Sequence, residues 1–387
     1  MKLVFASDSF KGSLDSREIS LLLQQAANEV FPHAKTVPLC IADGGEGSLQ
    51  VLMQALNGTI RTMDAADPFG RMISAQYGVF GRASAVIEMA QASGLPLIAD
   101  GQLNPEKASS RGTGMIIRHA LEHGVNDIII ALGGSATNDG GMGAMAELGV
   151  KFIDAAGREL SGCGRDLSSV AKVDLTQLHP ATRHATFTVM CDVSTPLLGE
   201  NGATHTFARQ KGADDAMVSR LEKGMQRYAA AVREAVGKDC SSYAGAGAAG
   251  GLGFALMSFL NAQVKSGIET VLNALNFNEI IQDADLVITG EGRADHQSAF
   301  GKVLSGVGSR CSQFGTPVIA IVGSLGPGYE QLYDCGINGI VTILDTPMSL
   351  QQAIENSRTL YLDAARRLFH IVDVAMSVRA GGKKNSE

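Results

Sequence analysis

Several features are missing from this 387-residue sequence, and each absence narrows the class of protein. No uninterrupted apolar run approaches the roughly 18 residues that a membrane-spanning helix needs. The start, MKLVFASDSFKGS, reaches Asp8 after a short apolar run, which predicts a first strand and not a secretory signal. The formal net charge is −7 and no Lys/Arg cluster builds a positive stripe, so we expect neither a nucleic-acid nor a membrane partner.

Tryptophan is absent, and the six cysteines form no CxxC pair or metal-like spacing. They indicate reduced, mostly buried thiols, and therefore a cytoplasmic protein. What the chain has instead is glycine, with 46 residues, and a hydrophobic share of 45%. This composition predicts a well-packed globular protein with many tight turns.

Short apolar runs alternate with helical patterns, and most of the runs end in polar or glycine-rich residues. This alternation predicts an α/β fold with mainly parallel sheets. In such sheets ligands bind beyond the carboxyl ends of strands, so the loops after the runs are the candidate sites. The expected strands lie within 2–7, 85–90, 127–132, 187–193, 285–290, 317–323 and 339–344.

The chain is long for one hydrophobic core, which predicts two domains. DAADPFGR, residues 64–71, interrupts the pattern, and the last strands resemble the first more than the middle ones. We therefore predict a discontinuous Rossmann-like α/β domain, 1–68 with 285–387, and an inserted α/β domain, 69–284. The active site is expected in the cleft between the two domains.

The loop in ALGGSATNDGGMGAMAELG, residues 131–149, holds more glycine than a turn from strand to helix needs. Backbone N–H groups exposed by glycines can converge on phosphate oxygens, and hydroxyls add donors. The alternative is that the glycines only allow close packing of helix against sheet. Asp139 would repel a bare phosphate, so it implies a metal ion or a hydroxyl nearby. The candidate nucleotide-binding residues are Gly133, Gly134, Ser135, Thr137, Asn138, Gly140 and Gly141.

Two further loops carry charged residues where strands are expected to end. In SDSFKGSL, Asp8, Ser9 and Lys11 can face a ligand, whereas Ser13 or Asp15 can simply cap the next helix. In ADGGEGS, Asp43 and Glu46 can orient a substrate hydroxyl or hold Mg²⁺ through water. The alternative for these two acids is a helix N-terminus that favours negative charge.

Two later loops repeat this pattern. CDVSTPLLGENGAT leaves Asp192 at the end of a strand, and ITGEGRADHQSAFGKV supplies Glu291, Arg293 and Asp295. The GK at 301–302 does not make a P-loop, because His296 stands where that motif requires glycine and Val303 where it requires a hydroxyl. Acidic, glycine-rich loops with lysine suit phosphoryl transfer, which depends on positioning and on charge neutralisation by Mg²⁺ and Lys/Arg.

GAGAAGG, residues 245–251, matches the GxGxxG pattern of dinucleotide sites letter by letter. The pattern needs a strand immediately before it, and GKDCSSYA is a poor strand. An NAD-dependent hydroxy-acid dehydrogenase is the alternative function that this segment leaves open.

Six separated motifs occur in one order: DSFKGSL, ADGGEGS, ALGGSATNDGGMG, CDVSTPLLGENGAT, GAGAAGGLG and ITGEGRAD. With these motifs in this order, the sequence resembles the bacterial class I glycerate kinases over almost its whole length. The resemblance implies an ATP- and Mg²⁺-dependent kinase that phosphorylates D-glycerate in glyoxylate or sugar-acid catabolism. It also implies that the product is 2-phosphoglycerate, although the residues alone do not separate the 2-hydroxyl from the 3-hydroxyl.

Residue roles in such a kinase are expected from loop position. Asp192 and Asp295 are candidates for the general base or, with Glu291, for the Mg²⁺ ligands, and Lys11 is a candidate for binding the transferred phosphoryl group. Arg71 and Arg293 can clamp the glycerate carboxylate, because an arginine fork binds it bidentately. Asp8, Ser9, Asp43 and Glu46 complete the expected substrate shell. Both a monomer and a homodimer remain open.

Overall fold

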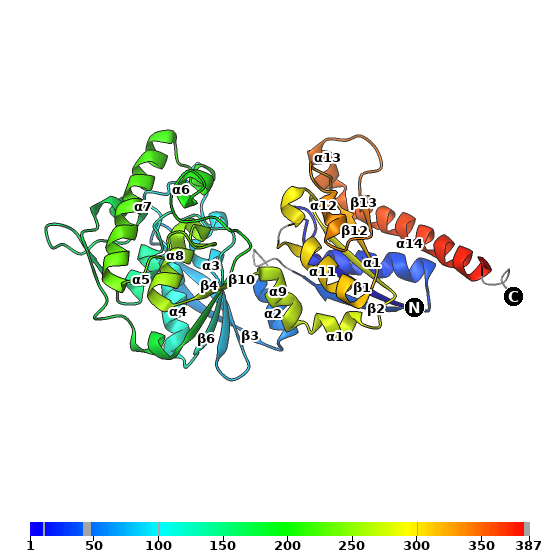
Figure 1. Ribbon diagram of the computed structural model, residues 1–387, viewed down its shortest axis with the longest axis horizontal. Helices are drawn as coiled ribbons and strands as arrows, with labels where there is room; N and C mark the ends of the chain where they lie inside the picture. The colour runs from blue at the N-terminus through cyan, green and yellow to red at the C-terminus, as the bar shows by residue number, and fades with distance from the viewer. Residues whose placement is uncertain (11, 42–47, 100, 300, 383–387) are drawn as a thin grey trace. The chain divides into compact units, whose positions relative to one another are not determined.

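A computed structural model describes residues 1–10, 12–41, 48–99, 101–299 and 301–382 (Figure 1). The chain divides into two compact units, Met1–Asp43 with Ile268–Glu387, called unit 1, and Gly44–Gly267, called unit 2. Each of the seven expected strands is present, and the prediction of a mixed α/β fold with mainly parallel sheets is confirmed.

Unit 1 contains a five-stranded sheet of order β13-β12-β11-β1-β2, in which every pairing is parallel. Its strands are β1 (Lys2–Ser7), β2 (Lys35–Cys40), β11 (Leu286–Glu291), β12 (Val318–Val322) and β13 (Gly339–Thr342). Its helices are α1 (Ser16–Val30), α9 (Gly267–Ala274), α10 (Phe277–Ile281), α11 (Val303–Phe314), α12 (Gln331–Asp334), α13 (Leu350–Glu355) and α14 (Ser357–Gly382), with a 3-10 turn at His296–Ala299.

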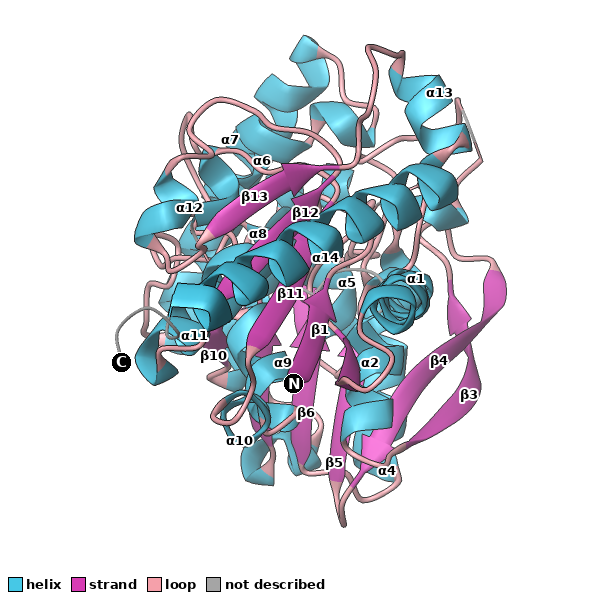
Figure 2. Ribbon diagram, turned by 90° about the vertical axis from the view of Figure 1, so that its right-hand side faces the viewer, coloured by secondary structure: helices cyan, strands magenta, loops and turns pink. Residues whose placement is uncertain are grey.

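The central strands β1 and β11 are buried on both faces, as their continuous apolar sequences predict. Leu3 and Phe5 of β1 belong to a core cluster that they share with α1 and α14, while Val4, on the opposite face, is also fully buried. Figure 2 shows α1 and α14 lying over the same face of this sheet. Asp15 is the residue that caps α1, because its carboxylate accepts the N–H of Glu18 at 2.7 Å.

Unit 2 contains a six-stranded sheet of order β10-β9-β6-β5-β4-β3 and a small antiparallel pair, β7 with β8. Its strands are β3 (Thr59–Ala66), β4 (Met72–Phe80), β5 (Ser84–Glu88), β6 (Asp127–Ala131), β7 (Lys151–Ile153), β8 (Lys172–Asp174), β9 (Thr186–Met190) and β10 (Gln263–Lys265). Its helices are α2 (Ser48–Ala55), α3 (Ala90–Ser93), α4 (Arg111–Glu122), α5 (Met142–Glu147), α6 (Ala203–Phe207), α7 (Asp215–Val236) and α8 (Ala248–Leu260). Short 3-10 helices lie at Leu95–Leu97, Gly164–Ser169, Pro180–His184 and Arg209–Lys211.

Residues 48–68 lie in unit 2, whereas the domain limits predicted from the sequence place them in the first domain. The physical reason is that β3 pairs with β4 along its whole length, from Thr59↔Val79 to Ala66↔Met72. DAADPFGR therefore contains the end of β3 and, at residues 67–71, the turn of a β-hairpin, and it is not a linker between domains. Likewise 268–284, expected in the inserted domain, lie in unit 1.

Candidate active site

The carboxyl ends of the strands in unit 2 meet at one edge of the six-stranded sheet. β5, β6, β9 and β10 run parallel, and the antiparallel β4 brings the turn Asp67–Arg71 to this same edge. The glycine-rich loop follows β6, and Asp192 follows β9, the neighbouring strand. The structure thus places Arg71, the glycine-rich loop and Asp192 along one edge, as expected for a ligand site.

The glycine-rich loop divides into two halves, and the outer half, 133–135, contains its accessible glycines. Gly133 is half-buried, Gly134 is exposed with φ +72°, and Ser135 is 8% exposed. The carbonyl of Gly134 accepts the N–H of Leu95 at 2.8 Å, which ties the loop to the segment after α3. No hydrogen bond within the described parts of the chain uses the N–H of Gly133 or Gly134. These two amides can therefore donate to an anion.

The inner half of the loop, 137–141, is buried, and its polar groups are directed into the protein. Asn138 donates from Nδ2 to Thr204 Oγ1 at 3.2 Å. The N–H of Gly140 donates to the carbonyl of Gly250 at 2.9 Å, and the N–H of Gly141 donates to Asp139 Oδ1 at 3.0 Å. A side chain at Gly140 would meet the Tyr228 ring, because an added Cβ would lie 2.5 Å from Cε1. In this half, the glycines serve close packing.

Asp139 is fully buried and holds the inner half together. Its Oδ2 accepts the N–H and the hydroxyl of Ser110, each at 2.7 Å, and the N–H of Gly143 at 3.2 Å. The sequence implied a metal ion or a hydroxyl near this acid, and the structure places the Ser110 hydroxyl there. Burial raises the pKa of Asp139, and the hydrogen bonds from Ser110, Gly141 and Gly143 oppose that rise.

Lys211 is a buried lysine beneath the same loop, and sequence reasoning missed it. Its side chain is 1% exposed, and Nζ donates to Ser135 Oγ at 2.8 Å and to the carbonyl of Thr137 at 2.7 Å. Burial lowers the pKa of Lys211 to about 7, and the charge of Asp139 opposes that fall. The sequence around it, FARQKGADD, holds no motif, so only the fold reveals its place.

The GAGAAGG segment packs against the inner half of the glycine-rich loop. Ala249, Gly250 and Gly251 have left-handed backbones, with φ of 52°, 65° and 93°. An added Cβ at Gly250 would lie 2.0 Å from the carbonyl oxygen of Thr137, so only glycine fits there. None of the residues from 237 to 247 lies in a strand. The structure thus confirms that GKDCSSYA forms no strand, and it disfavours the dinucleotide alternative, because a Rossmann site needs a strand at that place.

Asp192 and Arg71 are each held by a defined set of partners. Asp192 Oδ1 accepts the hydroxyl of Ser266 at 2.9 Å and the N–H of Gly267 at 2.8 Å. The Arg71 side chain is 60% exposed, and its Nε donates to Oδ2 of the buried Asp67 at 2.6 Å. This ion pair holds the guanidinium of Arg71 at Nε, while the side chain stays accessible to solvent.

Glu88 is a second residue that sequence reasoning missed. It is the last residue of β5, 3% exposed, and it accepts the N–H of Leu49 at 2.7 Å. A glutamate that ends a buried strand at the ligand edge was a detectable signal, because carboxylates are rarely buried without a partner. Sequence reasoning treated AVIEMA, residues 85–90, only as an apolar strand and did not consider its glutamate as a site residue.

In unit 1, the acids predicted from the sequence also gather where parallel strands end. The register Ser7↔Gly290 places Asp8 and Glu291 at matching positions of β1 and β11, and both side chains are buried. The N–H of Ser9 donates to Asp8 Oδ1 at 2.7 Å, and the hydroxyl of Ser298 donates to Glu291.

Asp295 and Arg293 form an ion pair in the loop that follows β11. The distance from Arg293 Nε to Asp295 Oδ2 is 3.3 Å, and the N–H of Gln297 donates to Asp295 Oδ1 at 3.0 Å. The Arg293 side chain is exposed and that of Asp295 is partly exposed. Three other predicted residues, Lys11, Asp43 and Glu46, lie outside the described part of the chain.

Carboxylate oxygens are suitable ligands for Mg²⁺, and Asp192, Glu291 and Asp295 supply them. The described residues contain no group of three or more His, Cys, Asp or Glu side chains arranged to hold a metal ion. The Mg²⁺ ligands named from the sequence stay a prediction.

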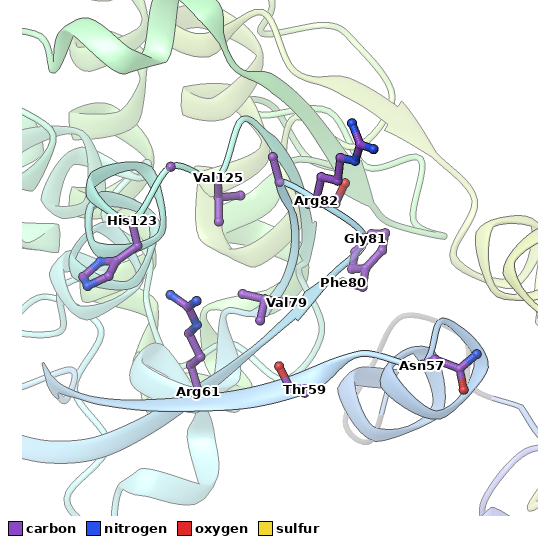
Figure 3. Close-up of a pocket in the computed structure, with 12 residues that line it drawn as sticks. Asn57, Thr59, Arg61, Val79, Phe80, Gly81, Arg82, His123 and Val125 are labelled. Carbon is purple, nitrogen blue, oxygen red and sulfur yellow. The ribbon is translucent and has the colours of Figure 1, made fainter.

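A pocket of about 250 Å³ lies at the opposite edge of the six-stranded sheet, before β5 and β6 (Figure 3). Figure 3 shows the guanidinium of Arg61 on the side of His123, whereas Arg82 extends away from both. No residue predicted for the site lines this pocket. Because ligands of such sheets bind at the carboxyl edge, we do not assign the substrate to it.

Comparisons with known proteins agree with the family resemblance that the six loop motifs indicate. The model of the "Glycerate kinase family" matches residues 3–373. The chain is 41% identical to a glycerate 2-kinase of Escherichia coli K12, over 97% of this chain and 99% of that protein. It is also 41% identical to a glycerate kinase of Halalkalibacterium halodurans, over 95% of this chain and 97% of that protein.

A crystal structure assigned to glycerate kinase 2 of Salmonella typhimurium LT2 has the same fold. Its TM-score is 0.84 at 39% identity, over 97% of this chain and 99% of that one. The fold and these relatives define the class of protein, which is a mixed α/β enzyme that acts as a kinase. The chain belongs to the glycerate kinase family. The resemblance drawn from the six motifs is thereby confirmed.

Proposed function

We propose that this enzyme transfers the γ-phosphoryl group of ATP to the 2-hydroxyl of D-glycerate and releases 2-phosphoglycerate and ADP. The observation that supports this proposal most is the outer half of the glycine-rich loop, where two accessible amides and a hydroxyl stand at the ligand edge of the sheet. Backbone N–H groups of this kind bind phosphate oxygens. A relative named glycerate 2-kinase supports the 2-hydroxyl as acceptor.

In this proposal the phosphate contacts come from Gly133, Gly134 and Ser135. The amides of Gly140 and Gly141 donate within the protein, so these residues, with Thr137 and Asn138, support the loop from below. Lys11, which lies outside the described residues, keeps its role in holding the transferred phosphoryl group.

The remaining roles belong to charged side chains at the strand ends. Arg71 and Arg293 bind the glycerate carboxylate, since both are exposed and each is oriented by an aspartate. Asp192 or Asp295 takes the proton of the acceptor hydroxyl. Mg²⁺, when bound, neutralises phosphate charge, and Asp192, Glu291 and Asp295 would supply its protein ligands. Asp8, Ser9, Asp43 and Glu46 orient the substrate.

The setting proposed for this reaction is the cytoplasm, in glyoxylate or sugar-acid catabolism. Among the described residues, no helix has the length and apolar character needed to span a bilayer.

Product analysis tests this proposal directly. The enzyme is incubated with ATP, Mg²⁺ and D-glycerate, and ¹H and ³¹P NMR spectra identify the product. We expect the spectrum of 2-phosphoglycerate, with ADP formed only when glycerate is present. A spectrum of 3-phosphoglycerate would favour the alternative, a glycerate 3-kinase, and would leave the family assignment intact.

Two substitutions test the candidates for the general base. Asp192→Asn and Asp295→Asn remove a carboxylate while keeping its size, and loss of a general base typically lowers kcat by about 10² to 10⁴-fold. Asp239→Asn, an exposed aspartate that accepts the N–H of Ser241, is the matched control. If both site variants kept near-normal kcat, neither residue would be the base.

A further inference from the structure

Lys211 is a charged side chain that the proposed reaction does not yet use. It lies in the 3-10 helix Arg209–Lys211, far along the chain from the loop, and its ammonium group is enclosed under 135–137. A lysine is almost never fully buried unless its charge is compensated, because removing an ammonium from water is costly. Its position beneath a candidate phosphate loop therefore calls for a functional explanation.

The chemistry of the two groups fixes the direction of the hydrogen bond between them. An ammonium group has three donors and no acceptor, whereas a hydroxyl has one donor and two acceptor lone pairs. In the 2.8 Å contact, protonated Lys211 must therefore donate and Ser135 Oγ must accept. The hydroxyl proton of Ser135 is then directed away from Lys211.

The second contact of Lys211 fixes the backbone of the loop. Its 2.7 Å hydrogen bond to the Thr137 carbonyl binds the same ammonium group to the residue at which the loop enters the core. Ser135 retains a small accessible area, and it adjoins the exposed Gly134. The hydroxyl itself lies in the buried contact with Lys211, one residue along the chain from an exposed glycine.

We propose that Lys211 is a positioning residue for phosphate binding, which holds the Ser135 hydroxyl as a donor to a nucleotide phosphate oxygen and fixes the outer half of the loop. This inference rests on the proposed function, in which that half of the loop binds the nucleotide. Lys211 acts through Ser135 and touches no substrate. While Lys211 is protonated, its charge also attracts the phosphates from behind the loop, where the low dielectric screens it little.

The experiment measures ADP affinity by titration calorimetry in the presence of Mg²⁺, together with kcat and KM for ATP. The variants are Ser135→Ala, Lys211→Met and the double variant. Lys223→Met, which removes an exposed lysine of α7, is the matched control for the loss of charge. Ser135→Thr keeps the hydroxyl and tests rescue.

We expect Lys211→Met to weaken ADP binding by 10-fold or more, with a similar rise in KM for ATP, and Ser135→Ala to weaken it by a smaller factor. The double variant should bind ADP about as weakly as Lys211→Met alone, because Ser135 loses its orientation once Lys211 is gone. Lys223→Met should bind ADP like the wild type, and Ser135→Thr should bind it more tightly than Ser135→Ala.

Independent, additive losses from the two single substitutions would overturn the inference, and so would wild-type ADP affinity in Lys211→Met. If Lys211→Met does not fold, Ser135→Ala still tests the proposal. Wild-type ADP affinity in Ser135→Ala would show that the Ser135 hydroxyl does not donate to the nucleotide phosphate. The wild-type measurement separates this inference from the proposed function. A wild type that binds no ADP contradicts the proposed kinase, whereas unchanged affinity in folded variants contradicts the role of Lys211 alone.

Discussion

The two halves of the glycine-rich loop have similar compositions and opposite environments. Gly133 and Gly134 are accessible, and their amides use no partner among the described residues, whereas Gly140 and Gly141 are buried and their amides donate within the protein. Glycine at 134 permits a backbone that a ligand can approach, while glycine at 140 makes room for the Tyr228 ring. A count of glycines therefore does not measure the size of a phosphate site.

The two halves are linked by a pair of buried charges. Asp139 organises the inner half, and Lys211 reaches from below to Ser135 of the outer half. The charge of Asp139 opposes the effect of burial on the pKa of Lys211, as expected for an acid near a buried base. The buried inner half and Lys211 thus hold the outer half in place through these hydrogen bonds.

The largest effect is expected from Asp139→Ala. This change leaves the buried donors of Ser110, Gly141 and Gly143 without their acceptor and removes the charge that compensates Lys211. The free energy of unfolding should fall by about 3 to 5 kcal/mol, as measured by urea denaturation.

The control for this change is Asp239→Ala. Asp239 also accepts a backbone N–H, from Ser241, but it is exposed, so water can replace the carboxylate. Its loss should cost about 0.5 kcal/mol. Equal losses in the two variants would show that Asp139 has no special structural role.

A matched pair of alanine substitutions separates the two halves directly. Gly134 and Gly140 both have left-handed backbones, with φ of +72° and +65°, so both changes carry the same strain of about 1 kcal/mol. An added Cβ at Gly140 lies 2.5 Å from the Tyr228 ring, whereas at Gly134 it lies 3.5 Å from Ala90 Cβ, an ordinary contact.

Gly140→Ala should therefore destabilise the protein by about 2 kcal/mol more than Gly134→Ala does, because the core must also absorb the clash. Gly134→Ala should instead raise KM for ATP, since it alters the accessible half. Thermal or urea unfolding, with kinetics on the same preparations, measures both effects. Equal losses of stability in the two variants would contradict the proposed difference between the buried and the accessible half of the loop.

The sequence predicts the strands and the edge of the sheet at which ligands bind, because apolar runs and the polar residues after them are local patterns. It does not predict which half of the loop is accessible. That property depends on Tyr228 and Gly250, which lie about 90 and 110 residues further along the chain. The partners of Asp139 show the same limit, since Ser110 comes from the start of α4.

The hairpin β3–β4 illustrates a different limit. Pro68 and Gly70 mark a turn correctly, but a turn residue does not tell whether the chain leaves the domain or folds back on itself. Pairing along the full length of the two strands decides the matter. Lys211 lacks even a local signal, because burial of a lone lysine is a product of tertiary packing.

The buried pair also predicts a dependence of stability on pH. The pKa of Lys211 is about 7 in the folded protein and near its ordinary value of 10.5 when unfolded. Between these values the unfolded chain binds the extra proton, so stability rises with pH. The cost of burying the charged lysine is fully present below pH 7 and is relieved as pH rises toward 10.5.

Urea unfolding of the wild type and of Lys211→Met between pH 6 and pH 9 measures this contribution. The wild type should gain stability relative to the variant above pH 7, with a slope that approaches about 1.4 kcal/mol per pH unit. Other groups titrate in both proteins and cancel in the difference, while Asp139 is the neighbouring charge that would move the midpoint. Parallel curves for the two proteins would place the pKa of Lys211 outside this range.

The smallest effect on stability is expected from Arg71→Met, which tests the accessible side of the ligand edge. The Arg71 side chain is 60% exposed, and the buried Asp67 keeps its hydrogen bonds from the N–H groups of Phe69 and Arg71, so the free energy of unfolding should fall by only about 1 kcal/mol. KM for D-glycerate should nevertheless rise about 10-fold or more, because the proposed bidentate contact with the substrate carboxylate is lost.

Arg71→Lys is the informative companion, because it keeps the charge and loses the fork. It should recover only part of the affinity if the geometry of the guanidinium matters. Arg158→Met is the matched control, since Arg158 also pairs with an aspartate four residues away, Asp154, but lies in an exposed turn remote in sequence from every predicted site residue. An unchanged KM for D-glycerate in Arg71→Met would assign the carboxylate to another cation and would leave the roles of the two loop halves as they stand.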